Sequence, residues 1–187
     1  MFDRRQLWKA GAAAVIAAAA TVIGTSSAWA HVIIQPGSLP KGASDVIFSF
    51  STPNETDNTN VTELQIFFPT NHPLLSAYAQ TKPGWTATVQ TAKLPKPVKT
   101  DDGTITEAVS EITWTATAGG IPPNQFDLFT VSVGALPSNT KSLEFKALQT
   151  YSDGTIVRWI EDPATKGGPA PDHPAPILKL TGKAPKG

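Results

Sequence analysis

The residue best suited to chemistry is His31, which follows the segment Ala28-Trp29-Ala30. Small residues at the first and third positions before a junction are those that a signal peptidase reads. Cleavage after Ala30 makes His31 the first residue, with a free amine and an imidazole Nδ1 that can chelate one metal ion. Both nitrogens suit copper(II), and an amine pKa of about 7.7–8.0 lets copper displace the proton near neutral pH. The junction therefore predicts a copper(II) site on His31.

A carboxylate for this site is predicted from a hairpin. If His31–Gln35 pairs with Asp45–Thr52, the two strands run antiparallel, and the end of the second strand lies beside the start of the first. That pairing brings Glu55 near His31, where its carboxylate offsets the charge of a metal ion. Without a metal site, Glu55 would be a solvated loop acid.

Four other residues are of a type that could take part in a metal site, but the sequence around each is also typical of a purely structural or surface role. Trp159 ends an apolar strand, which is typical of a core or edge tryptophan. His72 and His173 each precede a proline in a loop, so we expect surface histidines rather than ligands. Asp127 is the alternative acid; both of its neighbours are apolar, and it points away from the face that they share. We expect it to be structural or solvated.

Composition narrows the classes of function. The sequence has no Cys, and its single Met is Met1, so residues 31–187 offer a metal only nitrogen and oxygen. This disfavours a sulfur-based copper(I) site. The whole chain has 15 Lys+Arg and 15 Asp+Glu; residues 1–30 hold three basic residues and one acidic residue, so the remainder is slightly acidic. A slightly acidic surface argues against nucleic-acid binding and against docking on anionic membranes.

Residues 1–30 are predicted to be an export signal. Arg4 and Arg5 precede an Ala-rich apolar run, residues 10–23, which is short for a transmembrane helix. The paired arginines resemble a twin-arginine translocation (Tat) signal, and an uncleaved anchor is the alternative. No second apolar stretch follows. We therefore expect a secreted protein, periplasmic or extracellular, with no stable membrane span in the mature form.

Strand signals dominate residues 31–162. The candidate strands are short, rich in β-branched and aromatic residues, and separated by Gly, Pro, Asn and Asp. They are His31–Gln35, Asp45–Thr52, Thr62–Phe68, Trp85–Thr91, Ala108–Thr117, Phe126–Val133, Ser142–Tyr151 and Thr155–Trp159. Asp102-Gly103 and Asp153-Gly154 are hairpin-turn signals, and residues 73–79 are compatible with one helical turn. About eight short strands predict an all-β fold, an antiparallel immunoglobulin-like β-sandwich. Residues 163–187 are predicted to form a Pro/Gly-rich C-terminal extension.

Segments of one family pattern occur in order along the chain. They are His31-Val32-Ile33-Ile34, Pro53-Asn54-Glu55, Pro83-Gly84-Trp85, Ile112-Thr113-Trp114, Gly119-Gly120-Ile121, Gln125-Phe126, Tyr151–Trp159 and Pro174-Ala175-Pro176. Together they resemble the YcnI-like family of exported bacterial copper-binding proteins, in its actinobacterial form without a C-terminal membrane helix. The resemblance implies an immunoglobulin-like sandwich that binds copper(II) through an N-terminal histidine, a single-histidine brace. A carboxylate completes such a site and a tryptophan lies close to it, which here implies His31, Glu55 and Trp159.

Three classes of function follow from these observations. The leading hypothesis is a non-enzymatic copper(II)-binding protein in copper homeostasis or trafficking, which exchanges copper with other trafficking proteins. The second is a histidine-brace copper oxidase or oxygenase, which needs a second histidine within reach of His31. The third is a carbohydrate- or protein-binding sandwich with no metal, which a flat platform of exposed aromatic side chains would favour.

Overall fold

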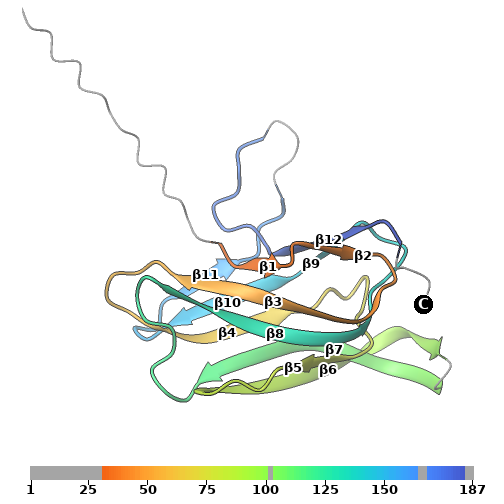
Figure 1. Cartoon of the computed structure of the whole chain (residues 1–187), viewed down its shortest axis with the longest axis horizontal. Coiled ribbons are helices and arrows are strands. Elements are labelled where there is room, and N and C mark those ends of the chain that lie inside the picture. Colours follow the sequence, from red (N-terminus) through yellow and green to blue (C-terminus); the bar gives the residue numbers. More distant parts are fainter. Residues whose placement is uncertain (1–30, 101–102, 164–167, 184–187) are drawn as a thin grey trace, which may run out of the picture.

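The computed structural model describes residues 31–100, 103–163 and 168–183. Within these ranges the chain is all-β and contains no helix, and therefore none that could span a membrane (Figure 1). The strands are β1 (Ile33–Gln35), β2 (Ser38–Pro40), β3 (Ser44–Asn54), β4 (Val61–Phe67), β5 (Ala77–Ala79), β6 (Trp85–Thr100), β7 (Gly103–Ala116), β8 (Gln125–Ala135), β9 (Ser142–Glu144), β10 (Lys146–Tyr151), β11 (Ile156–Trp159) and β12 (Ile177–Thr181).

Two larger sheets form the sandwich. One has the strand order β1-β3-β8-β5 and the other the order β11-β10-β4-β7-β6. A small third sheet, β2-β12-β9, contains the parallel pair β2 and β12, whereas the strand pairs of the two larger sheets are antiparallel. β1 and β11 are edge strands on one side of the molecule, and β5 and β6 are edge strands on the other (Figure 1). The sandwich therefore has two open edges, each bounded by one strand from each sheet.

The core lies between the two larger sheets because side chains alternate along their strands. In β3, Phe48 and Phe50 are buried, while Ile47 between them is 62% exposed. The ring of Phe145 packs against both phenylalanines, with centroid distances of 5.8 and 5.3 Å. Each buried side chain of this size contributes about 1.5–3 kcal/mol. The core is thus built from apolar residues of both sheets.

The predicted hairpin at the start of the domain is confirmed. β1 pairs antiparallel with β3, with Ile33 opposite Ser51 and Gln35 opposite Ser49. The turn predicted at Asp153-Gly154 is also confirmed, because it joins β10 to β11 and Gly154 has a φ of 86°, in the left-handed region that favours glycine.

Other parts of the strand pattern differ from the prediction. The predicted strand Ser142–Tyr151 is two strands, β9 and β10, because the first pairs with β12 and the second with β4. The predicted helical turn at residues 73–79 is wrong, since residues 77–79 form β5, which pairs with β8. β6 and β7 run further than predicted and form a long hairpin; Asp102, in its predicted turn, lies outside the described residues.

Strand β12, close to the C-terminus, packs with the sandwich. Residues 163–187 are predicted as an extension, and within them the structure places β12, with Leu178 and Leu180 buried in the core. β12 pairs with β2 on one side and β9 on the other. The segment before β12 is hydrogen-bonded to the residues that follow β11, because the N–H groups of Ile160 and Glu161 donate to the carbonyl oxygen of His173.

Candidate metal centre

His31 lies at the open edge of the sandwich, against Trp159. Their rings meet edge to face, with centroids 5.5 Å apart and planes inclined by 73°. Trp159 ends β11 and is 3% exposed, whereas His31 precedes β1 and is half-buried. Two edge strands from different sheets therefore place one imidazole on one buried indole.

A buried amide holds Trp159 in this position. Trp159 Nε1 donates a hydrogen bond of 2.9 Å to Gln149 Oε1, and Gln149 Nε2 donates one of 2.7 Å to the carbonyl oxygen of Pro53. Gln149 is fully buried, so both of these bonds are needed to offset the loss of water. The β1–β3 register, continued by two residues, brings Pro53 level with His31. Gln149 thus links β3, β10 and β11 next to His31.

The loop that carries Glu55 is fixed by Asn54. Asn54 Nδ2 donates to the carbonyl oxygens of Thr59 and Ile121, at 2.7 and 2.8 Å. Asn54 Oδ1 accepts from the backbone N–H and the hydroxyl of Thr56, at 3.0 and 2.8 Å. Asn54 is itself buried, so this network gives Glu55 a defined place beside the edge.

A cavity of about 180 Å³ lies between this loop and Trp159. Its lining residues are Pro53, Glu55, Thr56, Thr59, Tyr151, Asp153, Thr155, Val157 and Trp159. The lining includes two carboxylates and no cationic side chain. Burial raises the pKa of Tyr151, and the negative charges of Glu55 and Asp153 raise it further. The cavity therefore has a negative potential, which favours a cation.

The donor chemistry fits a copper(II) ion. Glu55 is exposed and makes no hydrogen bond or ion pair with another described residue, so its carboxylate is available. The imidazole of His31 provides a borderline nitrogen donor, which suits copper. Within the described ranges, no three His, Cys, Asp or Glu side chains gather into a metal-binding group.

The alternative acid lies in different surroundings. Asp127 Oδ1 forms an ion pair of 2.5 Å with Lys82 Nζ, so its charge is already compensated. Lys82 also lies over the ring of Phe129, 5.5 Å from its centroid. Asp127, on β8, is thus paired with the loop that precedes β6, whereas Glu55 lines the cavity next to Trp159.

His173 was predicted to be a surface histidine rather than a ligand, and the structure adds a contact with Trp159. Its ring packs on Trp159 with a centroid distance of 5.2 Å and an interplanar angle of 58°, and the side chain is half-buried. The sequence around His173 shows only a loop before a proline, because its contact with Trp159 depends on how the segment before β12 packs against the end of β11. His72, the other loop histidine, lies between β4 and β5.

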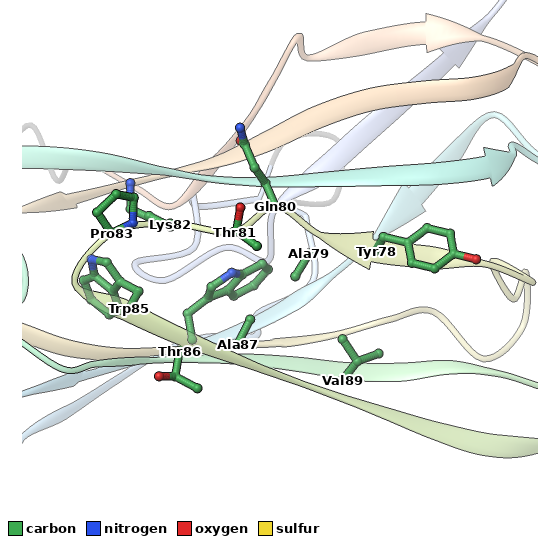
Figure 2. Close-up of a pocket in the computed structure, with 11 residues that line it drawn as sticks. Tyr78, Ala79, Gln80, Thr81, Lys82, Pro83, Trp85, Thr86, Ala87 and Val89 are labelled. Carbon is green, nitrogen blue, oxygen red and sulfur yellow. The ribbon is translucent and has the colours of Figure 1, made fainter.

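A larger open groove of about 670 Å³ lies at the opposite edge, between β5 and β6. Its exposed aromatic residue is Tyr78, which is 70% exposed, whereas Trp114 is buried. Trp85 packs edge to face on Phe129, with a centroid distance of 4.8 Å. Figure 2 shows Tyr78 and Trp85 at opposite ends of the groove, so they do not form one flat stacking platform.

Sequence reasoning missed two residues of the candidate site, Gln149 and Tyr151. Both occupy inward positions of β10, together with Ala147. A glutamine at an inward position of an otherwise apolar strand face is a signal for a buried hydrogen-bond network. Its partner Trp159 lies on the other strand of the predicted hairpin, whereas Pro53 comes from the other sheet, which no local pattern pairs with β10.

Fold and site define an immunoglobulin-like β-sandwich with a histidine–tryptophan pair at one open edge. Residues 31–180 match the family described as Domain of unknown function (DUF1775), and the chain belongs to this family, which is the YcnI-like family that the sequence resembles.

Two relatives support this assignment. The chain is 30% identical over 138 residues to the copper-binding protein CutI of Bacillus subtilis (strain 168), an alignment covering 74% of this chain and 59% of that protein. The chain thus spans less than two thirds of that relative. It is also 35% identical to an uncharacterized protein from Nocardia farcinica whose crystal structure reveals an immunoglobulin-like fold. That match has a TM-score of 0.63 and covers 80% of this chain and 97% of the other, which confirms the predicted fold class.

Proposed function

We propose that this protein is an exported, non-enzymatic copper(II)-binding protein that holds one copper ion at the His31 edge. The observation that carries the proposal is the placement of the His31 imidazole on Trp159, next to a cavity lined by Glu55 and without a cationic side chain. The copper-binding name of the relative CutI supports copper as the metal.

Each residue has a distinct role in the proposed site. The amine and imidazole of His31 chelate the ion, and the carboxylate of Glu55 supplies an anionic oxygen. Trp159 forms an apolar wall that orients the histidine, because its only polar atom, Nε1, is already bonded to Gln149. These donors include no sulfur, so the site favours copper(II) over copper(I).

Copper is cargo in this proposal. The ion is bound in the periplasm or outside the cell and exchanged with other copper-trafficking proteins, in support of copper homeostasis. Export through a twin-arginine-type signal removes residues 1–30 and frees the amine of His31. A site at an open edge of the sandwich suits exchange, because the ion is held at the surface rather than in the core.

The test combines mass spectrometry of the exported protein with a copper titration. We expect a mass that begins at His31 and binding of one copper(II) per chain. His31→Ala should abolish binding, while His72→Ala, a change at the loop histidine between β4 and β5, should leave it intact. A mature chain that begins elsewhere, or binding that survives His31→Ala, contradicts the proposal.

A further inference from the structure

The two larger sheets differ in the chemistry of their outer faces. On the outer face of the five-stranded sheet, Gln65 Nε2 donates to Glu111 Oε1 at 2.9 Å, and the hydroxyl of Thr115 donates to Glu63 Oε2 at 3.2 Å. Charged and polar side chains of this kind are expected on the solvent side of an antiparallel sheet. The outer face of β1, β3, β8 and β5 differs, because the outward positions of β3 from 47 to 53 and of β8 from 126 to 132 hold no charged residue.

Large apolar side chains are exposed on this uncharged face. They are Ile33, Ile47, Tyr78, Phe126 and Leu128, with exposed fractions between 39% and 70%. The register of the four strands places all five on the side of the sheet that faces away from the core. A contiguous apolar patch that remains exposed marks a site of interaction with another protein.

One row across the strands has a small side chain between two larger ones. Ile33, Ser51 and Leu128 lie side by side on β1, β3 and β8. Ser51 is 8% exposed, whereas the two apolar side chains that flank it are exposed. This row therefore offers a place between two apolar side chains to an apolar side chain of a partner.

The same face carries a side chain that fits this row. Ile47 lies on the same strand as Ser51 and is 62% exposed. Ser49 lies midway between them, and its hydroxyl is hydrogen-bonded to that of Thr130 at 2.9 Å. A twofold axis that crosses the strands at Ser49 brings Ile47 of each copy over Ser51 of the other, which is the self-complementary contact of a symmetric dimer. Because the face is uncharged, no like charges meet across this axis.

We propose that the outer face of β1, β3, β8 and β5 is the interface of a homodimer, in which Ile47 of each copy packs between Ile33 and Leu128 of the other. Four strands spaced by about 4.8 Å, over a length of about 24 Å from residue 47 to residue 53, give about 450 Å² of sheet plane per copy. Two copies together cover about 900 Å², in the range of weak and transient interfaces. The dimer is thus reversible, with a Kd of about 10–100 µM. It is independent of the proposed copper site, so its test uses metal-free protein.

Sedimentation velocity of metal-free protein beginning at His31, over a range of concentrations, tests the interface. We expect a monomer–dimer equilibrium in the wild type. Ile47→Lys and Leu128→Lys should each raise the Kd at least about tenfold, because a symmetric interface contains each substituted side chain twice. Ile156→Lys is the matched control: it is the same change at a 42% exposed isoleucine of β11, in the other sheet, and should alter the Kd less than about twofold. Thermal melts of all variants check folding.

The outcomes decide both the dimer and its face. Loss of the dimer in Ile47→Lys and Leu128→Lys but not in Ile156→Lys, with unchanged melts, supports the proposal. Dimerisation that survives both substitutions on β3 and β8, or that Ile156→Lys abolishes, overturns the assignment to this face. Protein that stays monomeric up to about 1 mM overturns the dimer and leaves the face to a different protein.

Discussion

Gln149→Leu is expected to destabilise the sandwich and to weaken the candidate site together. The substitution removes the amide that accepts from Trp159 Nε1 and donates to the carbonyl oxygen of Pro53. Gln149 is fully buried and Trp159 is 3% exposed, so water has little access to the groups left without partners. A buried polar group without a partner costs about 1–3 kcal/mol, and two of them give a loss of about 3 kcal/mol. At about 2–4 °C per kcal/mol for a domain of this size, Tm should fall by about 6–12 °C.

Thermal melts of metal-free protein, followed by copper titration below Tm, provide the assay. Gln65→Leu is the matched control: Gln65 lies on neighbouring β4, is half-buried, and donates only to Glu111 Oε1. It should change the free energy of unfolding by no more than about 1 kcal/mol. Gln149→Leu should also weaken copper binding about tenfold, because Trp159, which packs against His31, loses the hydrogen bond that fixes its position. A fall in Tm of less than 2 °C, roughly 1 kcal/mol or less, would refute the role given to this hydrogen-bond pair.

Three further predictions concern charge, pH and metal removal. Glu55→Gln should weaken copper binding about 30-fold, since a carboxylate near a divalent ion contributes about 2 kcal/mol in a water-like dielectric. Asp127→Asn should change the copper affinity less than about twofold in calorimetric titration. Loss of copper binding in Asp127→Asn would instead show that the carboxylate is misassigned. Because its pKa is raised, the neutral phenol of Tyr151 stabilises the folded state fully below a pH of about 10, and this contribution is lost as pH rises through the folded pKa. Tyr151→Phe should abolish this loss of stability in alkaline melts. Glu55→Gln should lower the pKa of Tyr151 in ultraviolet titration, and an unchanged pKa would place Glu55 away from the cavity. Protein stripped of metal should keep a β-rich circular dichroism spectrum and a cooperative melt, because apolar side chains build the core. A random-coil spectrum would contradict this prediction.

Local patterns predicted the strands and one part of the site. Alternation predicted β3, and the predicted pairing of His31–Gln35 with it put Glu55 on the side of His31, although β2 lies between the two strands. The small strands β2, β5 and β12 were not predictable, because three to five residues carry too little periodicity and their partners lie far away in sequence.

The remainder of the site depends on contacts between distant segments. Gln149 acts through a tryptophan on the next strand and a proline carbonyl from the other sheet. His173 reaches Trp159 only because the tail is bonded to Glu161. Only the Gln149–Trp159 pair lies within a predicted hairpin; the bond to Pro53 and the contact of His173 join segments that the sequence does not pair locally.

The central claim is that the free amine of His31 is a copper ligand, and calorimetric titration of two forms of the protein tests it most directly. One form begins at His31 and the other carries a single additional alanine before it. The added residue leaves the imidazole, Glu55 and Trp159 in place but moves the amine out of chelating reach. We predict one copper(II) bound by the first form and an affinity at least about 100-fold lower, roughly 2.7 kcal/mol, in the second. Equal affinity of the two forms would contradict the claim.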